Sequence, residues 1–214
     1  MQRFVAARAA LVVAALAVSV RAAEPQKNLI LPGEVFAVGG RTAFIFTPDA
    51  AAVPQTGPKP WILYAPTLAG LPDGHERWMH ERFTKAGVAV AGIDTGESYG
   101  SPEHVKAAEG LHAEMVRRGY AKRPALLGRS RGGLAAGAWA IAHPEWTAGL
   151  GGIYPVLDWR TYPGVEKAAP AYGLSADDLR GRVGELCPVE RIDVAARGGV
   201  RVCIIHGDDD KVVP

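Results

Sequence analysis

Residues 128–133 read Gly128-Arg129-Ser130-Arg131-Gly132-Gly133, which matches the pattern G-x-S-x-G. A short apolar run leads into this stretch, and a segment rich in Gly and Ala follows it. This context predicts a strand that turns sharply into a helix, with the Ser130 hydroxyl exposed above the sheet. Glycines on both sides leave room for tight packing, and the helix N-terminus favours negative charge beside the hydroxyl. The alternative is an ordinary glycine-rich turn in which Ser130 only caps the helix.

The alternation of apolar runs and helical patterns continues on both sides of this turn. Continuous apolar runs, each followed by a helix, are typical of a parallel sheet covered on both faces, so the sequence predicts an α/β fold. Two short alternating runs flank Gly39-Gly40, which predicts an N-terminal antiparallel hairpin. The expected hairpin strands are 34–38 and 41–47, the buried strands are 61–64, 88–93, 124–128, 150–154 and 200–206, and the helices are 76–86, 102–118, 131–143 and a short one near Leu179.

A second motif, His206-Gly207-Asp208-Asp209-Asp210-Lys211-Val212-Val213-Pro214, follows the last apolar run. With the serine turn and the strand order, it resembles the α/β-hydrolase superfamily, in particular secreted bacterial esterases and the catalytic domain of the prolyl oligopeptidase family. The resemblance covers residues 34–214. It implies an α/β-hydrolase fold, with Ser130 as the nucleophile and Asp210 as the acid that orients a catalytic histidine. Asp158 is a weaker candidate for the acid.

The resemblance also implies an oxyanion hole made of backbone N–H groups. One is the N–H of Arg131, directly after the nucleophile, and the other comes from the loop after the strand at 61–64. Many members of the family have His-Gly in this loop, whereas this chain has Ala65-Pro66-Thr67-Leu68. Proline has no N–H to donate, so Thr67 is the expected donor, with Leu68 next.

The catalytic histidine is the part of the family pattern that this sequence does not show. In the family it follows the acid by one further strand, and all six histidines here precede Asp210. We therefore expect a C-terminally incomplete domain that lacks its last strand and helices, leaves 200–206 as an exposed edge, and has little or no hydrolase activity. Among the histidines we expect His104 and His112 to face solvent, His206 to shape the acid loop, and His75, His80 and His143 to be structural.

Two further sets of residues each allow two interpretations. Arg129 and Arg131 flank the serine, and they either bind an anionic substrate group or, as we expect, pair with nearby acids. Residues 159–185 are the natural place for a small cap over the site. Trp159, Tyr162 and Tyr172 in this segment either line an acyl pocket or simply pack together.

Residues 1–22 are predicted to be a secretory signal peptide, which leaves 23–214 as the hydrolase domain. A basic start precedes an uncharged apolar run at 9–20, and small residues then offer a cleavage site. The run is too short to span a bilayer, so we expect a secreted or periplasmic protein without stable membrane insertion.

The composition of the 214-residue chain, with 48% hydrophobic and 21% charged residues, is that of a globular protein. The net charge falls from +2 to −1 without the three arginines of the signal peptide, and no cationic stripe indicates a nucleic-acid partner. With no metal-ligand cluster and no phosphate-binding glycine loop, we expect neither a metal nor a cofactor. Cys187 and Cys203 are either two small buried side chains or a disulfide, and Cys203 lies in a run that predicts a buried strand.

The leading interpretation is a serine hydrolase that cleaves a small-molecule ester or a peptide through an acyl-enzyme on Ser130. The motifs do not separate these two substrate classes, although the small size favours an esterase. The alternative is a non-catalytic binding protein, or an inactive fragment, on the same scaffold. The absent histidine favours this alternative, whereas the serine turn and the Asp210 loop oppose it.

Overall fold

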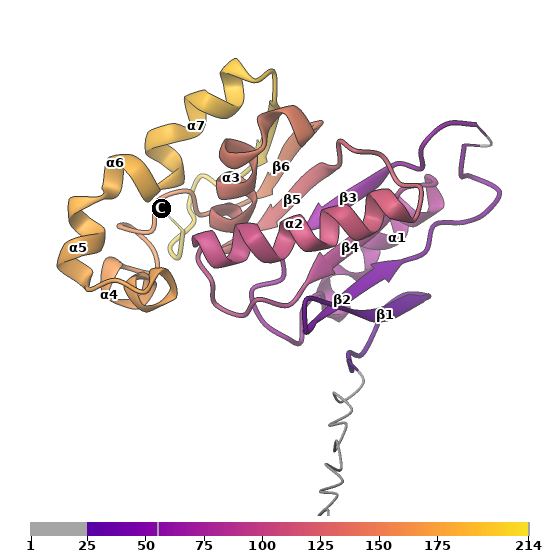
Figure 1. Cartoon of the computed structure of the whole chain (residues 1–214), viewed down its shortest axis with the longest axis horizontal. Helices are drawn as coiled ribbons and strands as arrows, with labels where there is room; N and C mark the ends of the chain where they lie inside the picture. The colour runs from indigo at the N-terminus through magenta and orange to yellow at the C-terminus, as the bar shows by residue number, and fades with distance from the viewer. Residues whose placement is uncertain (1–24, 55, 214) are drawn as a thin grey trace, which may run out of the picture.

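A computed structural model describes residues 25–54 and 56–213 (Figure 1). A seven-stranded sheet runs in the order β1-β2-β4-β3-β5-β6-β7. β2 is antiparallel to both of its neighbours, and β4, β3, β5, β6 and β7 are parallel. This arrangement is the mostly parallel sheet that the sequence predicted. The strands are β1 (Gly33–Val38), β2 (Arg41–Phe46), β3 (Trp61–Tyr64), β4 (Ala89–Ile93), β5 (Ala125–Arg129), β6 (Gly149–Ile153) and β7 (Arg201–Ile205).

The predicted hairpin joins β1 to β2 at one edge of the sheet. Val38 pairs with Arg41, so the turn consists of Gly39 and Gly40 alone. Their φ angles are +56° and +79°, which is the backbone that a two-residue hairpin turn requires and that glycine adopts without strain. The prediction of this turn is confirmed.

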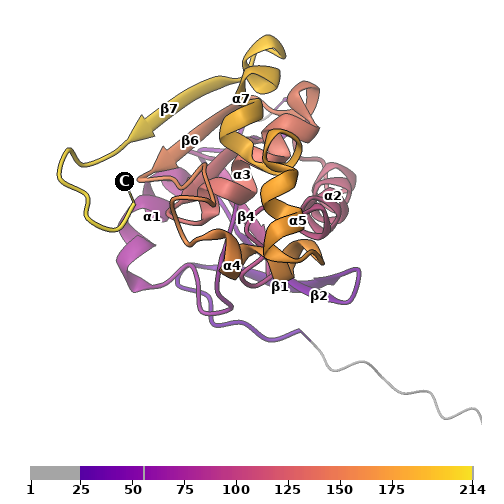
Figure 2. The ribbon, with the colours of Figure 1, turned by 90° about the vertical axis from the view of Figure 1, so that its left-hand side faces the viewer.

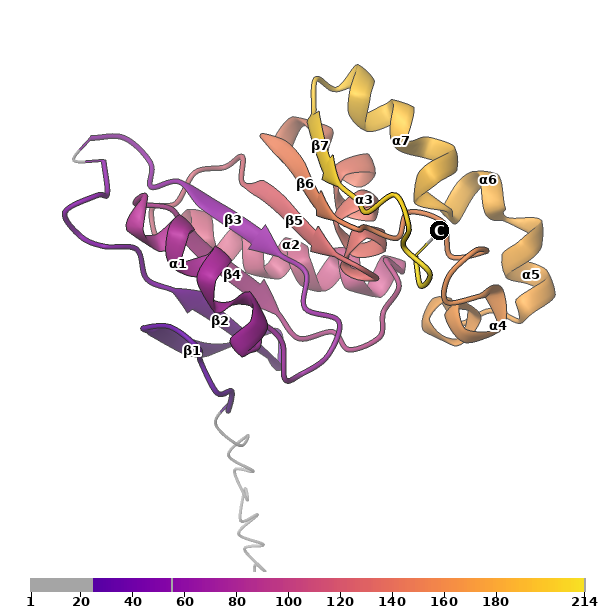
Figure 3. The same cartoon turned by 180° about the vertical axis from the view of Figure 1, so that it is seen from behind.

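Helices cover both faces of the sheet (Figures 1 and 3). α1 (Arg77–Lys85) lies on one face, and α2 (Pro102–Arg117) and α3 (Gly132–Ala142) lie on the other. Four more helices between β6 and β7 gather at one end of the molecule (Figure 1), and the sequence predicted only α5 among them. They are α4 (Val165–Ala168), α5 (Ala176–Gly181), α6 (Val183–Leu186) and α7 (Pro188–Arg197), and the 3-10 turns are η1 (Gly74–Glu76), η2 (Pro144–Trp146) and η3 (Ala169–Tyr172).

Buried apolar side chains form three clusters. One fills the space between the sheet and helices α2 and α3, and a second lies between the sheet and α1. The third packs against α4, α5 and α6. Large buried members of the three clusters are Trp139, Tyr64 and Trp159, each no more than 2% exposed. Most of the sheet is therefore held by packing on both of its faces.

β7 is the other edge of the sheet, and it is exposed along its whole length (Figures 2 and 3). Ile205 is 68% exposed, and a hollow of about 520 Å³ opens between α1 and the β6–β7 end of the sheet. The exposed edge is as expected, but the burial predicted for the strand at 200–206, Cys203 included, is wrong, because β7 has a neighbour on one side only. Cys187 is buried and both thiols are free, so the structure contains no bridge between them.

Within residues 25–54 and 56–213, none of the helices is long and apolar enough to cross a bilayer. The same part of the chain has no group of three or more His, Cys, Asp or Glu side chains that could hold a metal ion. The predicted signal peptide lies outside the described residues.

Candidate active site

Ser130 lies between β5 and α3 with a φ of +50°, in the left-handed region that strains an ordinary side chain. Its N–H donates to the Ile153 carbonyl at 3.0 Å, and its own carbonyl accepts from the N–H groups of Gly133 and Val156, both at 2.9 Å. The N-cap of α3 is Arg131, so Ser130 does not cap the helix. In the described part of the chain the partly exposed Ser130 makes no side-chain hydrogen bond. The backbone is thus fixed while the hydroxyl is left free.

Glycines make this turn possible, as the sequence predicted. A Cβ atom at Gly128 would lie 2.7 Å from the Gly132 carbonyl oxygen, and one at Gly132 would lie 2.9 Å from the carbonyl oxygen of Ala65. A Cβ at Gly133 would lie 2.5 Å from the carbonyl oxygen of Val156. All three contacts are with backbone, which cannot move aside, so each position requires glycine.

Backbone strain gathers at the edge of the sheet that carries Ser130. The non-glycine residues with positive φ in the described chain are Tyr99, Ser130 and Tyr154, at +48°, +50° and +36°. They follow β4, β5 and β6 respectively, and these parallel strands end at the same edge. Strained backbone persists where the surrounding structure holds it, and it concentrates at functional sites.

The loop that carries Thr67 packs directly against the serine turn. The Ala65 N–H donates to the Leu127 carbonyl at 3.2 Å, and the carbonyl of Ala65 faces Gly132. Among the described residues, the N–H groups of Arg131 and Thr67 donate to no acceptor. The structure therefore brings this loop to the serine turn and leaves both expected oxyanion donors available.

The Asp210 carboxylate is held by its own loop. Its Oδ1 accepts from the N–H groups of Val212 at 2.8 Å and Val213 at 2.9 Å, and these bonds lower the pKa of Asp210. His206 contacts the same loop, with its Nε2 2.9 Å from the Val213 carbonyl oxygen and 3.7 Å from Asp210 Oδ2. His206 thus shapes the acid loop, as expected.

Two hydrogen bonds connect the strand ends that carry the expected nucleophile and acid. The Ser130 N–H donates to Ile153 at the end of β6, and the Tyr154 N–H donates to the Ile205 carbonyl at the end of β7 at 2.6 Å. Ser130 directly follows β5, and Asp210 lies five residues after Ile205. Both residues therefore lie beyond the carboxyl ends of strands in one sheet, and β6 alone separates those strands.

The two arginines beside the serine pair with acids, as expected. Arg129 lies 3.3 Å from the Glu76 carboxylate, and Arg131 lies 2.9 Å from that of Glu97. Their acidic partners differ, since the side chain of Glu76 is 3% exposed and that of Glu97 is 31% exposed. The sequence did not reveal that Glu76 is buried, because it showed Glu76 only as the first residue of a predicted helix.

The prediction that His104 and His112 face solvent is wrong. They are 4% and 7% exposed, because they lie on the side of α2 that packs inward. His104 Nδ1 lies 2.8 Å from the Thr95 hydroxyl, and His112 Nε2 lies 2.8 Å from the Lys122 carbonyl oxygen. Each ring therefore finds a polar partner inside the fold, which hydropathy alone did not reveal.

The remaining histidines have no hydrogen bond to Ser130 within the described part of the chain. His80 is fully buried, with its ring edge-on to those of Phe46 and Tyr64. His143 stacks on Trp146 at 4.4 Å, and its Nε2 lies 2.8 Å from Glu109. These contacts agree with the structural roles expected for His80 and His143.

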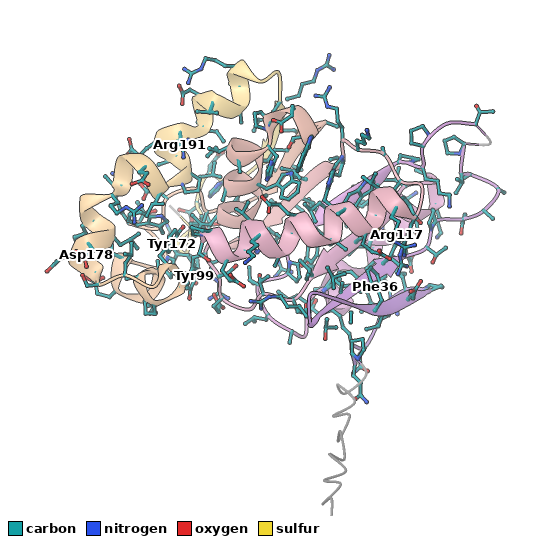
Figure 4. All side chains as sticks on the ribbon, in the orientation of Figure 1. Phe36, Tyr99, Arg117, Tyr172, Asp178 and Arg191 are labelled. Atoms are coloured by element: carbon teal, nitrogen blue, oxygen red, sulfur yellow. The ribbon has the colours of Figure 1, made fainter. Side chains whose placement is uncertain are left out.

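Asp158 and two aromatic residues of the segment 159–185 have structural partners. The Asp158 carboxylate accepts a hydrogen bond from the Arg160 guanidinium at 2.6 Å. Burial raises the pKa of Asp158, but the hydrogen bonds from Arg160 outweigh the effect of burial, so the pKa is lowered overall. Trp159 is fully buried, and the Tyr172 hydroxyl donates to the Tyr99 carbonyl at 2.8 Å, which joins this segment to the loop after β4 (Figure 4). For Trp159 the packing interpretation therefore holds.

Comparison with known proteins identifies the fold. No protein-family model and no curated protein matches the chain. Among solved structures, it is similar to a puromycin-hydrolyzing peptidase of Mycobacterium tuberculosis, with 18% identity and a TM-score of 0.65 over 85% of this chain and 31% of that one. It is also similar to Est1E from Butyrivibrio proteoclasticus, with 18% identity and a TM-score of 0.59 over 85% of this chain and 80% of that one.

A third structure, from Lactobacillus plantarum and proposed to be a carboxylesterase, is 15% identical, with a TM-score of 0.53 over 86% of this chain and 78% of that one. The chain thus spans about a third of the length of the peptidases it matches and about four fifths of the two shorter proteins. These likenesses show that the chain has the α/β-hydrolase fold.

Proposed function

We propose that the protein is a serine hydrolase that cleaves an ester or a peptide bond through an acyl-enzyme on Ser130. The observation that carries the proposal is the turn at Ser130, where a strained backbone is fully hydrogen-bonded while the hydroxyl has no partner in the described chain. A structural serine in a tight turn normally satisfies its hydroxyl locally. A free hydroxyl above the carboxyl edge of the sheet suits a nucleophile instead.

Each part of the site has a role in this reaction. The Ser130 oxygen attacks the substrate carbonyl carbon, and its proton passes to a histidine that Asp210 orients. The N–H groups of Arg131 and Thr67 bind the oxyanion, and the N-terminus of α3 adds a favourable dipole. The bond to the leaving group then breaks as the histidine returns the proton to that group, and a water molecule, deprotonated by the same histidine, releases the acyl group from Ser130.

The proton acceptor is the component that the described residues do not place beside Ser130. Our hypothesis is therefore that the 214-residue chain acylates slowly. Added imidazole is expected to act as the acceptor and to accelerate hydrolysis of a chromogenic acyl ester. The Ser130→Ala variant in the same imidazole measures the background rate. Equal rates for the two proteins would refute the proposal, whereas rapid Ser130-dependent turnover without imidazole would refute only the absence of a base.

A second candidate function is a non-catalytic binding protein on the same scaffold, which the lack of a histidine at Ser130 favours. A fluorophosphonate, which reacts with activated serines, distinguishes the two candidates when imidazole is present. A hydrolase is expected to form an adduct at Ser130, whereas a binding protein is expected to remain unmodified.

A further inference from the structure

Glu76 is the one carboxylate that is buried in the described part of the chain, at 4% exposure. It ends η1, directly before α1, and it accepts from the Asp73 N–H at 3.4 Å in a capping box. Capping a helix does not require burial, because carboxylates at helix starts are commonly hydrated. A buried carboxylate must instead be satisfied by partners inside the protein.

The partners of Glu76 come from the ends of two strands. The Tyr64 hydroxyl donates to Glu76 at 3.0 Å, and the Arg129 guanidinium lies 3.3 Å from the same Oε1 atom. Burial and the neighbouring carboxylate of Glu76 raise the pKa of Tyr64, so its hydroxyl keeps its proton and donates. Tyr64 is the last residue of β3 and precedes the loop with Thr67, while Arg129 is the last residue of β5 and precedes Ser130.

We propose that Glu76 is a positioning residue that joins the serine turn to the loop of Thr67 and so fixes the distance between nucleophile and oxyanion donor. The meaning of this link for catalysis rests on the proposed function. Ser130 and Thr67 belong to different strand ends, and small errors in their separation are costly in an acyl-transfer site. Because the carboxylate is buried, neither strand end can shift without leaving it unpaired.

Amide hydrogen exchange tests the link independently of activity. In Glu76→Gln the shape of the side chain is kept and its charge is lost. Exchange is expected to rise about tenfold or more in both 65–70 and 130–135, the segments that directly follow β3 and β5, as for loss of a charged hydrogen bond. The control is Glu81→Gln, because Glu81 is a partly exposed acid on α1 whose carboxylate pairs with Arg77 and Lys85 of the same helix. The Glu81→Gln variant should leave amide exchange unchanged in both segments.

Tyr64→Phe removes one hydroxyl and serves if Glu76→Gln folds poorly. It is expected to raise exchange in the same two segments, and to add little in the Glu76→Gln background, because both changes break one link. A rise in only one segment, in neither, or equally in β1 and β2 would overturn the proposal, since each indicates local or general loosening.

Reaction of Ser130 with a fluorophosphonate in imidazole gives a second readout. If Glu76 positions the site, Glu76→Gln should lower the maximal rate of phosphonylation about tenfold or more and leave the half-saturating concentration unchanged. An unchanged maximal rate would overturn the positioning role. If the unaltered protein itself fails to react, the proposed function fails instead, and the coupled exchange still shows whether Glu76 joins the two strand ends.

Discussion

Ser130 and Asp210 lie at ends of strands in one sheet, yet the structure holds them in different ways. Ser130 follows β5, which is inside the sheet, and three glycines of its turn lie directly against backbone atoms. Asp210 follows β7, an exposed edge strand, and its carboxylate is held by two N–H groups of its own loop. The nucleophile half of the site is fixed by the core, whereas the acid half depends on short-range hydrogen bonds.

The largest expected difference between the two halves is in local opening. Amides of β5 should exchange only when the whole protein unfolds, while those of β7 can exchange after the edge strand alone detaches. With an ordinary global stability, exchange in β5 should be slower than in β7 by about a thousandfold or more. Hydrogen exchange followed by mass spectrometry measures both strands in one experiment. Similar protection of the two strands would contradict the comparison.

Acidification should destabilise the fold as a whole before it weakens the acid loop. Burial lowers the pKa of His80 and of His104 to about 4, compared with about 6.5 in the unfolded chain. The unfolded chain thus binds protons first, so each histidine reduces the free energy of unfolding by up to about 3 kcal/mol as the pH falls from about 6.5 to 4. The pKa of Asp210 is lowered, so its contribution is present above its unfolded pKa of about 3.9 and is lost only at lower pH.

Urea denaturation across this pH range provides the measurement for the acidification prediction. The control is His80→Phe, which keeps an aromatic ring beside Phe46 and removes the titrating group. This variant should lose less stability on acidification than the unaltered protein. A flat stability profile between about pH 6.5 and 4 would show that the buried rings are not held neutral.

A matched pair of glycine substitutions gives the smallest of these effects. Gly128→Ala places a Cβ 2.7 Å from backbone and should destabilise the fold by about 2 kcal/mol or more. Gly207→Ala, in the acid loop, meets no atom within 4 Å and should change stability by less than about 0.5 kcal/mol. Thermal or urea unfolding compares the two variants. Equal effects would show that the serine turn is no more tightly packed than the acid loop.

The serine turn and the strand order could be predicted because their signals are local. Gly128 and Gly132 flank the serine at fixed spacing, and Gly39-Gly40 encodes its own turn, so neither needs information from distant residues. The helices between β6 and β7 escaped prediction, apart from α5 with its Ser175 cap. α4 and α6 are four residues each, too short for a helical period to be visible.

The surroundings of individual side chains could not be predicted in the same way. His112 looks like a surface residue in sequence, and only the fold shows that the Lys122 carbonyl oxygen lies beside its ring. Glu76 has partners 12 and 53 positions away along the chain, so its burial depends on how β3, η1 and β5 come together. The fold could therefore be predicted from patterns along the chain, whereas the contacts of His112 and Glu76 become visible only once the fold is known.

Mapping a fluorophosphonate adduct tests most directly whether Ser130 is a nucleophile. The 214-residue chain is incubated with the reagent and imidazole, and intact mass and peptide masses are then determined. We predict a single phosphonyl group on Ser130 and none on the Ser130→Ala variant. An adduct on a different serine, or an unmodified Ser130 in a protein whose fold is intact, would contradict the account.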